Sequence, residues 1–278
     1  MHADSRFADQ VFKTLACDTP RPGVARITLN RPARMNAYNH VMTTELQAAI
    51  ALYRDDDSLR ALILTGAGER AFCTGGDLSG GDPEHGRNVA RSPMGHGREM
   101  REGMQAVVLA LRRLDKPSLA MVRGYAVAGG LALALACDFR FAARSAKLGD
   151  TSNKAGLLPD EGGAWLFPHA MGLDRALKMS LMHEIYPAEV AERLGLVTEV
   201  VDDAGIEDRT LDFCEALAAK APLAVRLTKM MMEKALTTGL ESSLADAQMA
   251  VMITNPSQDV REGVAAFREK RAPKFEGR

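Results

Sequence analysis

The sequence predicts an α/β fold, because strand patterns and helix patterns alternate along most of its length. Residues 24–29 alternate in polarity like a half-buried strand, and residues 59–65 form a second, apolar strand. Between them, residues 41–53 carry apolar side chains at helical spacing. A second cycle follows, with a mostly helical stretch over 94–114 and a strand over 117–122. This alternation is typical of α/β proteins.

After about residue 205 the strand patterns cease. Helices are predicted over residues 208–220, 222–236, 240–254 and 257–270, with Pro222 and Pro256 suited to first turns. We therefore expect two regions, a core over residues 1–205 and a helical region over residues 206–278.

Composition and charge exclude several classes of function. The chain has 278 residues, a net charge of -1, and an ordinary 46% of hydrophobic residues. That charge gives no reason to expect nucleic acid or a membrane surface as a partner. The six histidines show no metal-ligand spacing, so no metal site is expected.

The four cysteines are scattered along the chain without a C-x-x-C pair. This pattern favours reduced thiols in a cytoplasmic protein, and the first residues contain no apolar segment typical of a signal peptide. Cys73 lies in a glycine-rich turn, yet no activating histidine is near it in sequence, which favours a packing role.

The most informative features are two glycine-rich turns, at residues 71–78 and 124–130. Glycine allows the main chain to approach a ligand closely, and N–H groups from two turns can converge on one oxygen. Such an arrangement stabilises an enolate or another oxyanion. The sequence therefore indicates acyl chemistry.

These turns and several further motifs occur in a characteristic order. The motifs are Asn30-Arg31-Pro32, Asn36-Ala37, Ala71 to Leu78, Val122 to Gly130, Cys137-Asp138, Pro159 to Gly163, Arg261-Glu262-Gly263, Phe267 and Lys270-Arg271. In the combination, order and spacing of these motifs, the chain resembles members of the crotonase superfamily, the enoyl-CoA hydratase/isomerase family. The resemblance covers almost the whole length.

The resemblance implies a spiral of repeated ββα units followed by a helical C-terminal region that packs trimers, two of which commonly stack into a hexamer. It implies an acyl-CoA thioester as substrate, with coenzyme A as part of that substrate and no separate cofactor. By position, the main-chain N–H groups of Gly76 and Gly129 would form the oxyanion hole. One such donor is worth about 3–4 kcal/mol in a transition state.

The resemblance also implies which residues bind coenzyme A. Arg34 would lie at the phosphopantetheine and phosphates, and Asp77 and Leu78 along the pantetheine. Phe267 and Lys270 would reach the adenine and phosphate end, often from a neighbouring subunit. Cationic side chains suit phosphate because they form charge-assisted hydrogen bonds.

The sequence departs from the hydratases of the family at both of their glutamates. Those positions hold Ala132 and Ser152, and neither side chain is a carboxylate. Alanine cannot accept a proton, and serine without a base is a poor substitute. Syn-hydration of a 2-enoyl-CoA is therefore not expected by the usual route.

Asp160 is the predicted proton carrier in their place. Isomerases of the superfamily use an aspartate here, and the surrounding motifs resemble phenylacetate-pathway isomerases that act on ring-epoxide CoA thioesters. We expect Asp160 to be buried against Leu157, Leu158 and other apolar residues, which would raise its pKa. The alternative is a helix N-cap. Glu161 is the second candidate acid or base, and Asp150 is a weaker one.

The sequence thus predicts an acyl-CoA isomerase, with three alternatives open. Asp160 or Glu161 could activate water in a hydratase or hydrolase, or Asp160 could attack an aryl-CoA as in the dehalogenases of the superfamily. The chain could also bind acyl-CoA without catalysis. Choice of the acyl group is expected to depend on the polar loop over residues 79–97 and on side chains of the helices.

Overall fold

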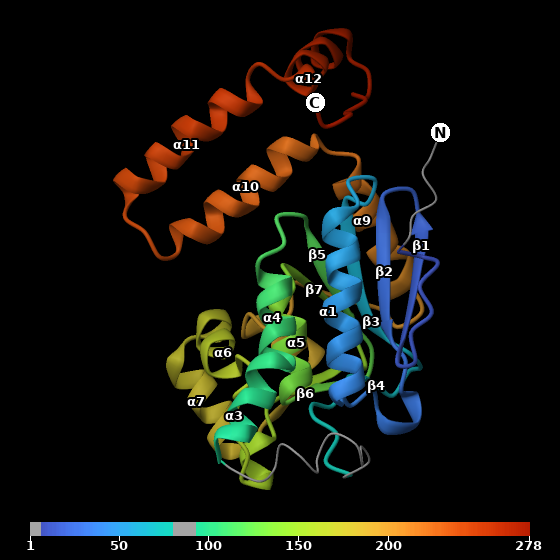
Figure 1. Cartoon of the computed structure of the whole chain (residues 1–278), viewed down its shortest axis with the longest axis vertical. Coiled ribbons are helices and arrows are strands. Elements are labelled where there is room, and N and C mark those ends of the chain that lie inside the picture. Colours follow the sequence, from blue (N-terminus) through green and yellow to red (C-terminus); the bar gives the residue numbers. More distant parts are fainter. Residues whose placement is uncertain (1–6, 80–92) are drawn as a thin grey trace.

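The computed structural model describes residues 7–79 and 93–278, and it contains two sheets (Figure 1). The six-stranded sheet has the order β1-β2-β3-β5-β7-β10, and the four-stranded sheet has the order β4-β6-β8-β9. Only the β1–β2 and β8–β9 pairs are antiparallel, so both sheets are mixed. The predicted α/β class is confirmed.

The strands are short. They are β1 (Leu15–Arg21), β2 (Val24–Leu29), β3 (Ala61–Gly66), β4 (Ala71–Cys73), β5 (Ser118–Val122), β6 (Tyr125–Val127), β7 (Phe139–Ala143), β8 (Lys147–Gly149), β9 (Ile185–Pro187) and β10 (Glu199–Val201). The helices up to the last strand are α1 (His40–Asp55), α3 (Pro93–Glu102), α4 (Met104–Arg112), α5 (Gly129–Ala136), α6 (Gly163–Met171), α7 (Leu173–Met182) and α8 (Ala188–Arg193). Then follow α9 (Ile206–Ala218), α10 (Pro222–Ala235), α11 (Leu240–Thr254) and α12 (Gln258–Glu269).

The chain builds both sheets at once, in repeated ββα turns. In each turn one strand joins the larger sheet and the next joins the smaller: β3 and β4, then β5 and β6, then β7 and β8. Strands β2, β3, β5, β7 and β10 of the larger sheet are parallel to one another, as are β4, β6 and β8 of the smaller sheet, so within each set the carboxyl ends lie at one edge. This is the spiral that the family resemblance implies.

Helix α5 is buried along its whole length. All eight of its residues, Gly129 to Ala136, are apolar or glycine. A helix that is apolar on every side is stable only in the interior. Its N-terminus is therefore fixed by packing on all sides, which gives a precise position to the turn that precedes it.

The C-terminal helices differ in how they pack. Helix α9 contacts β1, β2, β3, β5 and β7 and buries Ile206, Thr210, Cys214 and Ala218. Helices α10 and α11 bury no residue and extend away from the sheets together with α12 (Figure 1). The boundary predicted at residues 205 and 206 stays a prediction, and α9 by its contacts covers the larger sheet.

The predicted elements agree closely with the structure in most places. The four C-terminal helices lie within two residues of their predicted bounds, and α1 is longer than predicted by one residue before and two after. The helical stretch over 94–114 divides into α3 and α4, because Gly103 has a non-helical main chain (φ −92°, ψ −111°). The loop predicted over 79–97 lies mostly outside the described residues, and α3 begins at residue 93. No described helix has the length and apolar character needed to cross a lipid bilayer.

Candidate active site

The two glycine turns follow neighbouring parallel strands. Gly75 and Gly76 come after β4, and Ala128 and Gly129 come after β6, which pairs directly with β4. A Cβ added to Gly75 would lie 3.3 Å from the main-chain nitrogen of Gly129. Parallel pairing thus brings the two turns into contact, although about fifty residues separate them in sequence.

The N–H of Gly76 takes no part in the bridge between Gly76 and Tyr38, because the neighbours of Gly76 make the two bonds. The Tyr38 N–H donates to the Gly75 carbonyl at 2.9 Å, and the Asp77 N–H donates to the Tyr38 carbonyl at 2.9 Å. In a parallel bridge these neighbours of Gly76 supply the bonds, so the N–H of Gly76 itself points to the opposite side. It can therefore donate to a substrate oxygen.

The N–H of Gly129 is available for a different reason. Gly129 is the first residue of α5, and the first N–H groups of a helix have no partner within it. The positive end of the helix dipole adds to the attraction for an anion. The preceding residue, Ala128, has a positive φ of 52°, which is unusual for a residue with a Cβ. The second turn is thus held in a conformation that packing must stabilise.

Tyr38 and Glu161 meet against the α-carbon of Gly129. The Tyr38 hydroxyl donates a buried hydrogen bond to Oε1 of Glu161. A Cβ on Gly129 would lie 2.3 Å from that same Oε1 and 2.6 Å from the Tyr38 hydroxyl oxygen. Glycine is therefore required at position 129, and a buried carboxyl group lies next to the second predicted oxyanion donor.

Glu161 has the environment of an acid or base. It is 7% exposed, and burial raises its pKa, against the hydrogen bond from Tyr38, which lowers it. Asp160 and Asp150 raise the pKa further by charge repulsion. The second oxygen, Oε2, is buried without a hydrogen-bond partner among the described residues. A buried carboxyl group with one unoccupied oxygen is suited to proton transfer.

The expected burial of Asp160 is wrong. Asp160 is exposed, as are Leu157 and Leu158, whereas its neighbour Glu161 is buried. Asp160 is not the N-cap of α6 either, because Gly162 occupies that position and no side chain caps the helix. The loop before α6 turns inward one residue later than expected. The role of Asp160 in proton transfer stays a prediction.

The two positions of the hydratase glutamates hold no acid. Ala132 is fully buried within α5. Ser152 is buried, and its N–H and hydroxyl donate to Oδ1 of Asp150 at 3.0 and 2.7 Å. Asp150 follows β8, the strand next to β6, and its Oδ2 is buried without a partner in the described part of the chain. A second buried carboxyl group thus lies at the same edge of the small sheet.

The predicted coenzyme A residues near the first turn differ in their exposure. Arg34 is exposed in a 3-10 turn before Asn36, and Leu78 is 72% exposed. Asp77 is partly buried and accepts a hydrogen bond from Arg31 at 2.7 Å. These residues precede or follow Tyr38 and Gly76 in the chain, and their role in binding coenzyme A stays a prediction.

The other two predicted coenzyme A residues are remote from the turns within one chain. Phe267 is 86% exposed on α12, and Lys270 forms the left-handed C-cap of that helix. In Figure 1 α12 lies at the end of the molecule opposite β6 and α3. A role for both residues therefore requires a neighbouring subunit, as the resemblance implies.

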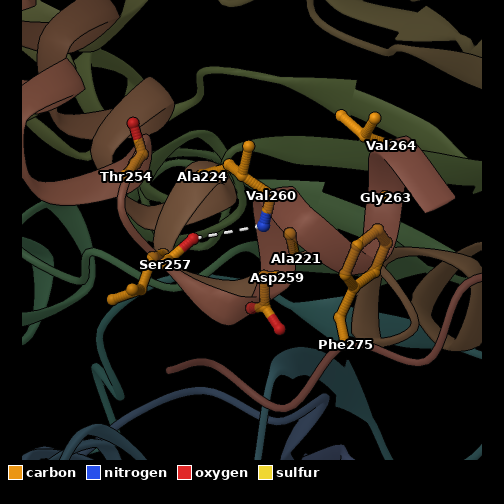
Figure 2. Close-up of a pocket in the computed structure, with 10 residues that line it drawn as sticks. Ala221, Ala224, Thr254, Ser257, Asp259, Val260, Gly263, Val264 and Phe275 are labelled. Carbon is orange, nitrogen blue, oxygen red and sulfur yellow. Dashed lines mark hydrogen bonds between the residues drawn. The ribbon is translucent and has the colours of Figure 1, made fainter.

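A separate cavity of about 270 Å³ lies near the C-terminus, between α10 and α12 (Figure 2). Apolar side chains line most of it, including Val260, Val264 and Phe275. Its one carboxylate, Asp259, already accepts from the N–H groups of Glu276 and Gly277 at 2.8 and 2.9 Å. This carboxylate fastens the C-terminal tail and is not available for catalysis.

Two residues of the site, Tyr38 and Arg31, were not predicted as such from the sequence. Tyr38 follows the quoted Asn36-Ala37 motif, but no sequence signal connects it with Glu161, 123 positions later. Cys73 is buried beside them, and burial raises its pKa to about 12, so its thiol stays protonated. The packing role predicted for Cys73 agrees with this environment.

Known proteins resemble the chain in sequence and in fold. The profile of the family described as "Enoyl-CoA hydratase/isomerase" matches residues 20–278. (E)-Benzylidenesuccinyl-CoA hydratase of Thauera aromatica is 37% identical over 254 residues, covering 91% of this chain and 96% of that protein. 1,2-Epoxyphenylacetyl-CoA isomerase of Escherichia coli (strain K12) is 37% identical over 260 residues, covering 92% and 96%.

The crystal structure of an enoyl-CoA hydratase from Bacillus anthracis matches with a TM-score of 0.88 and 31% identity, over 96% of this chain and all of that chain. The interleaved sheets and the paired glycine turns define an α/β protein of the crotonase fold. The chain belongs to the enoyl-CoA hydratase/isomerase family and is an enzyme of that family acting on acyl-CoA.

Proposed function

We propose that this enzyme is an acyl-CoA isomerase in which Gly76 and Gly129 stabilise a thioester enolate and Glu161 carries the proton. The observation that carries the proposal is the position of the Glu161 carboxyl group against the α-carbon of Gly129. In the proposed complex the thioester carbonyl oxygen of the substrate accepts from the Gly129 N–H. The α-carbon of the substrate is bonded to that carbonyl carbon, so the proton that must leave it lies near the Glu161 carboxyl group.

The reaction needs one group that removes and returns a proton. For a 3-enoyl-CoA, Oε2 of Glu161 takes the proton from C2, and the electron pair delocalises onto the thioester oxygen. The same carboxyl group then donates the proton to C4, the double bond moves to C2–C3, and the enzyme is regenerated. No atom is gained or lost, so no water or cofactor is consumed.

Hydration is the second candidate, on a specific observation. Asp150 Oδ2 is a second buried carboxylate oxygen without a partner among the described residues, at the strand edge that also carries Gly129. Two carboxyl groups allow one to activate water while the other protonates the α-carbon. Against this, Ser152 already occupies Oδ1 of Asp150 with two hydrogen bonds.

The test is to offer the purified enzyme a 3-enoyl-CoA and to follow conjugation by ultraviolet absorbance, with product mass as a check. Isomerisation raises the absorbance at unchanged mass, whereas addition of water raises the mass. Glu161→Gln keeps the shape and removes the base, and we expect a loss of about a hundredfold or more in kcat.

Asp160→Asn is the matched comparison, because the two acids are adjacent and only Glu161 is buried. We expect this variant to stay within about tenfold of the parent enzyme, below the usual acid–base contribution. A larger loss of kcat in Asp160→Asn than in Glu161→Gln would assign proton transfer to Asp160. Full activity in both variants would exclude proton transfer by this loop.

A further inference from the structure

Tyr38 is joined to one half of the site by its main chain and to the other half by its side chain. Its N–H and C=O bond to Gly75 and Asp77, at 2.9 Å each, on either side of Gly76. Its hydroxyl donates to Oε1 of Glu161. One residue thus links the first oxyanion donor to the proposed proton carrier.

The ring of Tyr38 spans the distance between the two glycine turns. A Cβ on Gly76 would lie 3.7 Å from the ring edge, and one on Gly129 would lie 2.6 Å from the hydroxyl oxygen. The side chain is only 9% exposed, so it is held in place by packing. Its length therefore sets how far Glu161 lies from Gly76.

The phenol is a permanent donor. Burial, and after it the charge of Glu161, raise the pKa of Tyr38 far above its ordinary value, so the hydroxyl keeps its proton. A hydroxyl that stays protonated occupies Oε1 throughout and leaves Oε2, which has no partner in the described structure, as the oxygen that exchanges a proton.

We propose that Tyr38 is a positioning residue that binds Oε1 of Glu161, so that Oε2 carries the proton at a fixed distance from the Gly76 donor. This inference rests on the proposed function. It assigns a role to Tyr38, which directly follows the Asn36-Ala37 motif but is not among the motifs that carry the family resemblance. Tyr38 itself transfers no proton in this scheme, because its donor bond persists.

The charged and titratable groups around Glu161 determine what removal of the hydroxyl does to its pKa. Asp160 and Asp150 raise that pKa, as burial does, and Cys73 is a neutral thiol. The Tyr38 hydroxyl opposes them by stabilising the carboxylate. Without the hydroxyl the pKa of Glu161 must rise, and the enzyme needs a higher pH to hold its base in the active form.

The experiment compares Tyr38→Phe with Tyr186→Phe. Tyr186 is the matched control, because its hydroxyl also donates to a glutamate, Glu184, and it lies on β9, which pairs with β8 and with neither β4 nor β6. In Tyr38→Phe we expect the acidic limb of kcat against pH to move upward by about one pH unit, with kcat lowered at least tenfold and KM within about threefold. Tyr186→Phe should leave the limb in place.

Infrared difference titration of the Glu161 carboxyl band, assigned by subtraction of Glu161→Gln, gives a readout that needs no turnover. The band should titrate at higher pH in Tyr38→Phe than in the parent enzyme. Equal titration in both proteins would overturn the inference, as would an unmoved kcat profile in an active enzyme. An inactive parent enzyme with a shifted band would contradict the proposed function and leave the role of Tyr38 supported.

Discussion

Arg31 and Asp77 form a hydrogen-bonded ion pair, with Nη2 of Arg31 2.7 Å from Oδ2 of Asp77. Nη1 of Arg31 donates to the carbonyl of Ala37 at 2.5 Å, so a single guanidinium holds the segment before Tyr38 against the turn of Gly76. The side chains are only 18% and 10% exposed, so water screens the pair weakly. The first half of the proposed oxyanion site thus includes a contact between residues 46 positions apart.

The Asp77 contact should stabilise the protein in a pH-dependent way. Bonds from Ser79, and after them one from Arg31, lower the pKa of Asp77 from 3.8 to about 2, against partial burial. Since the folded value lies below the unfolded one, the stabilisation is full above about pH 4 and is lost as the pH falls towards 2. We expect Asp77→Asn to lower the free energy of unfolding by about 2 kcal/mol at pH 7, and by less at pH 3.

Urea unfolding at both pH values measures this difference. Asp55→Asn is the control, because Asp55 pairs with Arg54 at an exposed position and should leave the free energy of unfolding unchanged. A destabilisation by Asp77→Asn that is equal at pH 7 and pH 3 would show that charge is not its cause.

Of the two glycines of the first turn, Gly75 should be sensitive to replacement by alanine and Gly76 should tolerate it. Gly75 has a φ of +91°, and a Cβ there would lie 3.2 Å from the Cβ of Ala128, so Gly75→Ala strains the turn by about 1–3 kcal/mol. The nearest atoms to a Cβ on Gly76 belong to the side chain of Tyr38, at an ordinary 3.7 Å. We expect kcat/KM to fall at least tenfold in Gly75→Ala and to stay within about threefold in Gly76→Ala.

Steady-state kinetics on the same acyl-CoA ester measure both variants. A strong defect in Gly76→Ala would mean that a ligand atom needs the space beside that α-carbon. Near-parent activity in Gly75→Ala would mean that the contact between the turns can relax without displacing the Gly129 N–H.

Ion pairs join helix α10 to the core, and none of its residues is fully buried. Nζ of Lys229 lies 2.7 Å from Oδ2 of Asp138, and the two side chains are 10% and 16% exposed. Lys229→Met would leave a largely buried carboxylate without its cation. We expect a loss of about 2–3 kcal/mol in the free energy of unfolding.

Lys234→Met is the matched variant on the same helix. Its pair with Asp246 is 54% and 30% exposed, so its loss should change the free energy of unfolding by less than about 0.5 kcal/mol. Urea denaturation measures both. If the two variants destabilise equally, burial of the Lys229 pair has no energetic consequence.

The helical arm of α10 and α11 should associate with further copies of the chain. Large apolar side chains are exposed along it: Met230, Met232, Leu236, Leu240, Leu244, Met249, Val251, Met252 and Ile253. An exposed apolar surface of this kind usually marks an interface. We expect sedimentation equilibrium to give three or six times the 30.0 kDa of one chain.

Leu244 and Val251 lie on one face of α11, seven residues apart, and the double change of both to glutamate should yield monomers. Ser242→Glu, on the opposite face, is the control. Because Phe267 and Lys270 lie far from the turns of their own chain, the monomer should also bind the CoA ester more weakly. A parent protein that sediments at 30.0 kDa would contradict the prediction.

The sequence predicted the elements well, and the site only in part. The glycine turns were visible because φ and close approach restrict residue choice locally, as at Gly75. The sequence could not show which of the adjacent acids Asp160 and Glu161 is buried. That depends on where the loop before α6 turns inward, and in the structure it buries Glu161. Tyr38 escaped notice because its partner, Glu161, is 123 positions away in sequence and approaches it only in the folded chain. The short strands β8 and β9 carry too few residues for a pattern.

The packing of α9 on the larger sheet has a consequence for biosynthesis. As the chain leaves the ribosome, the strands β1 to β7 emerge before the helix that contacts five of them. Until residue 218 is free, the apolar face beneath α9 has no cover, and an incomplete chain exposes a surface suited to aggregation. The last sixty residues, α10 to α12, are not needed to close that face. The nascent protein therefore covers this aggregation-prone surface within the length of a single helix.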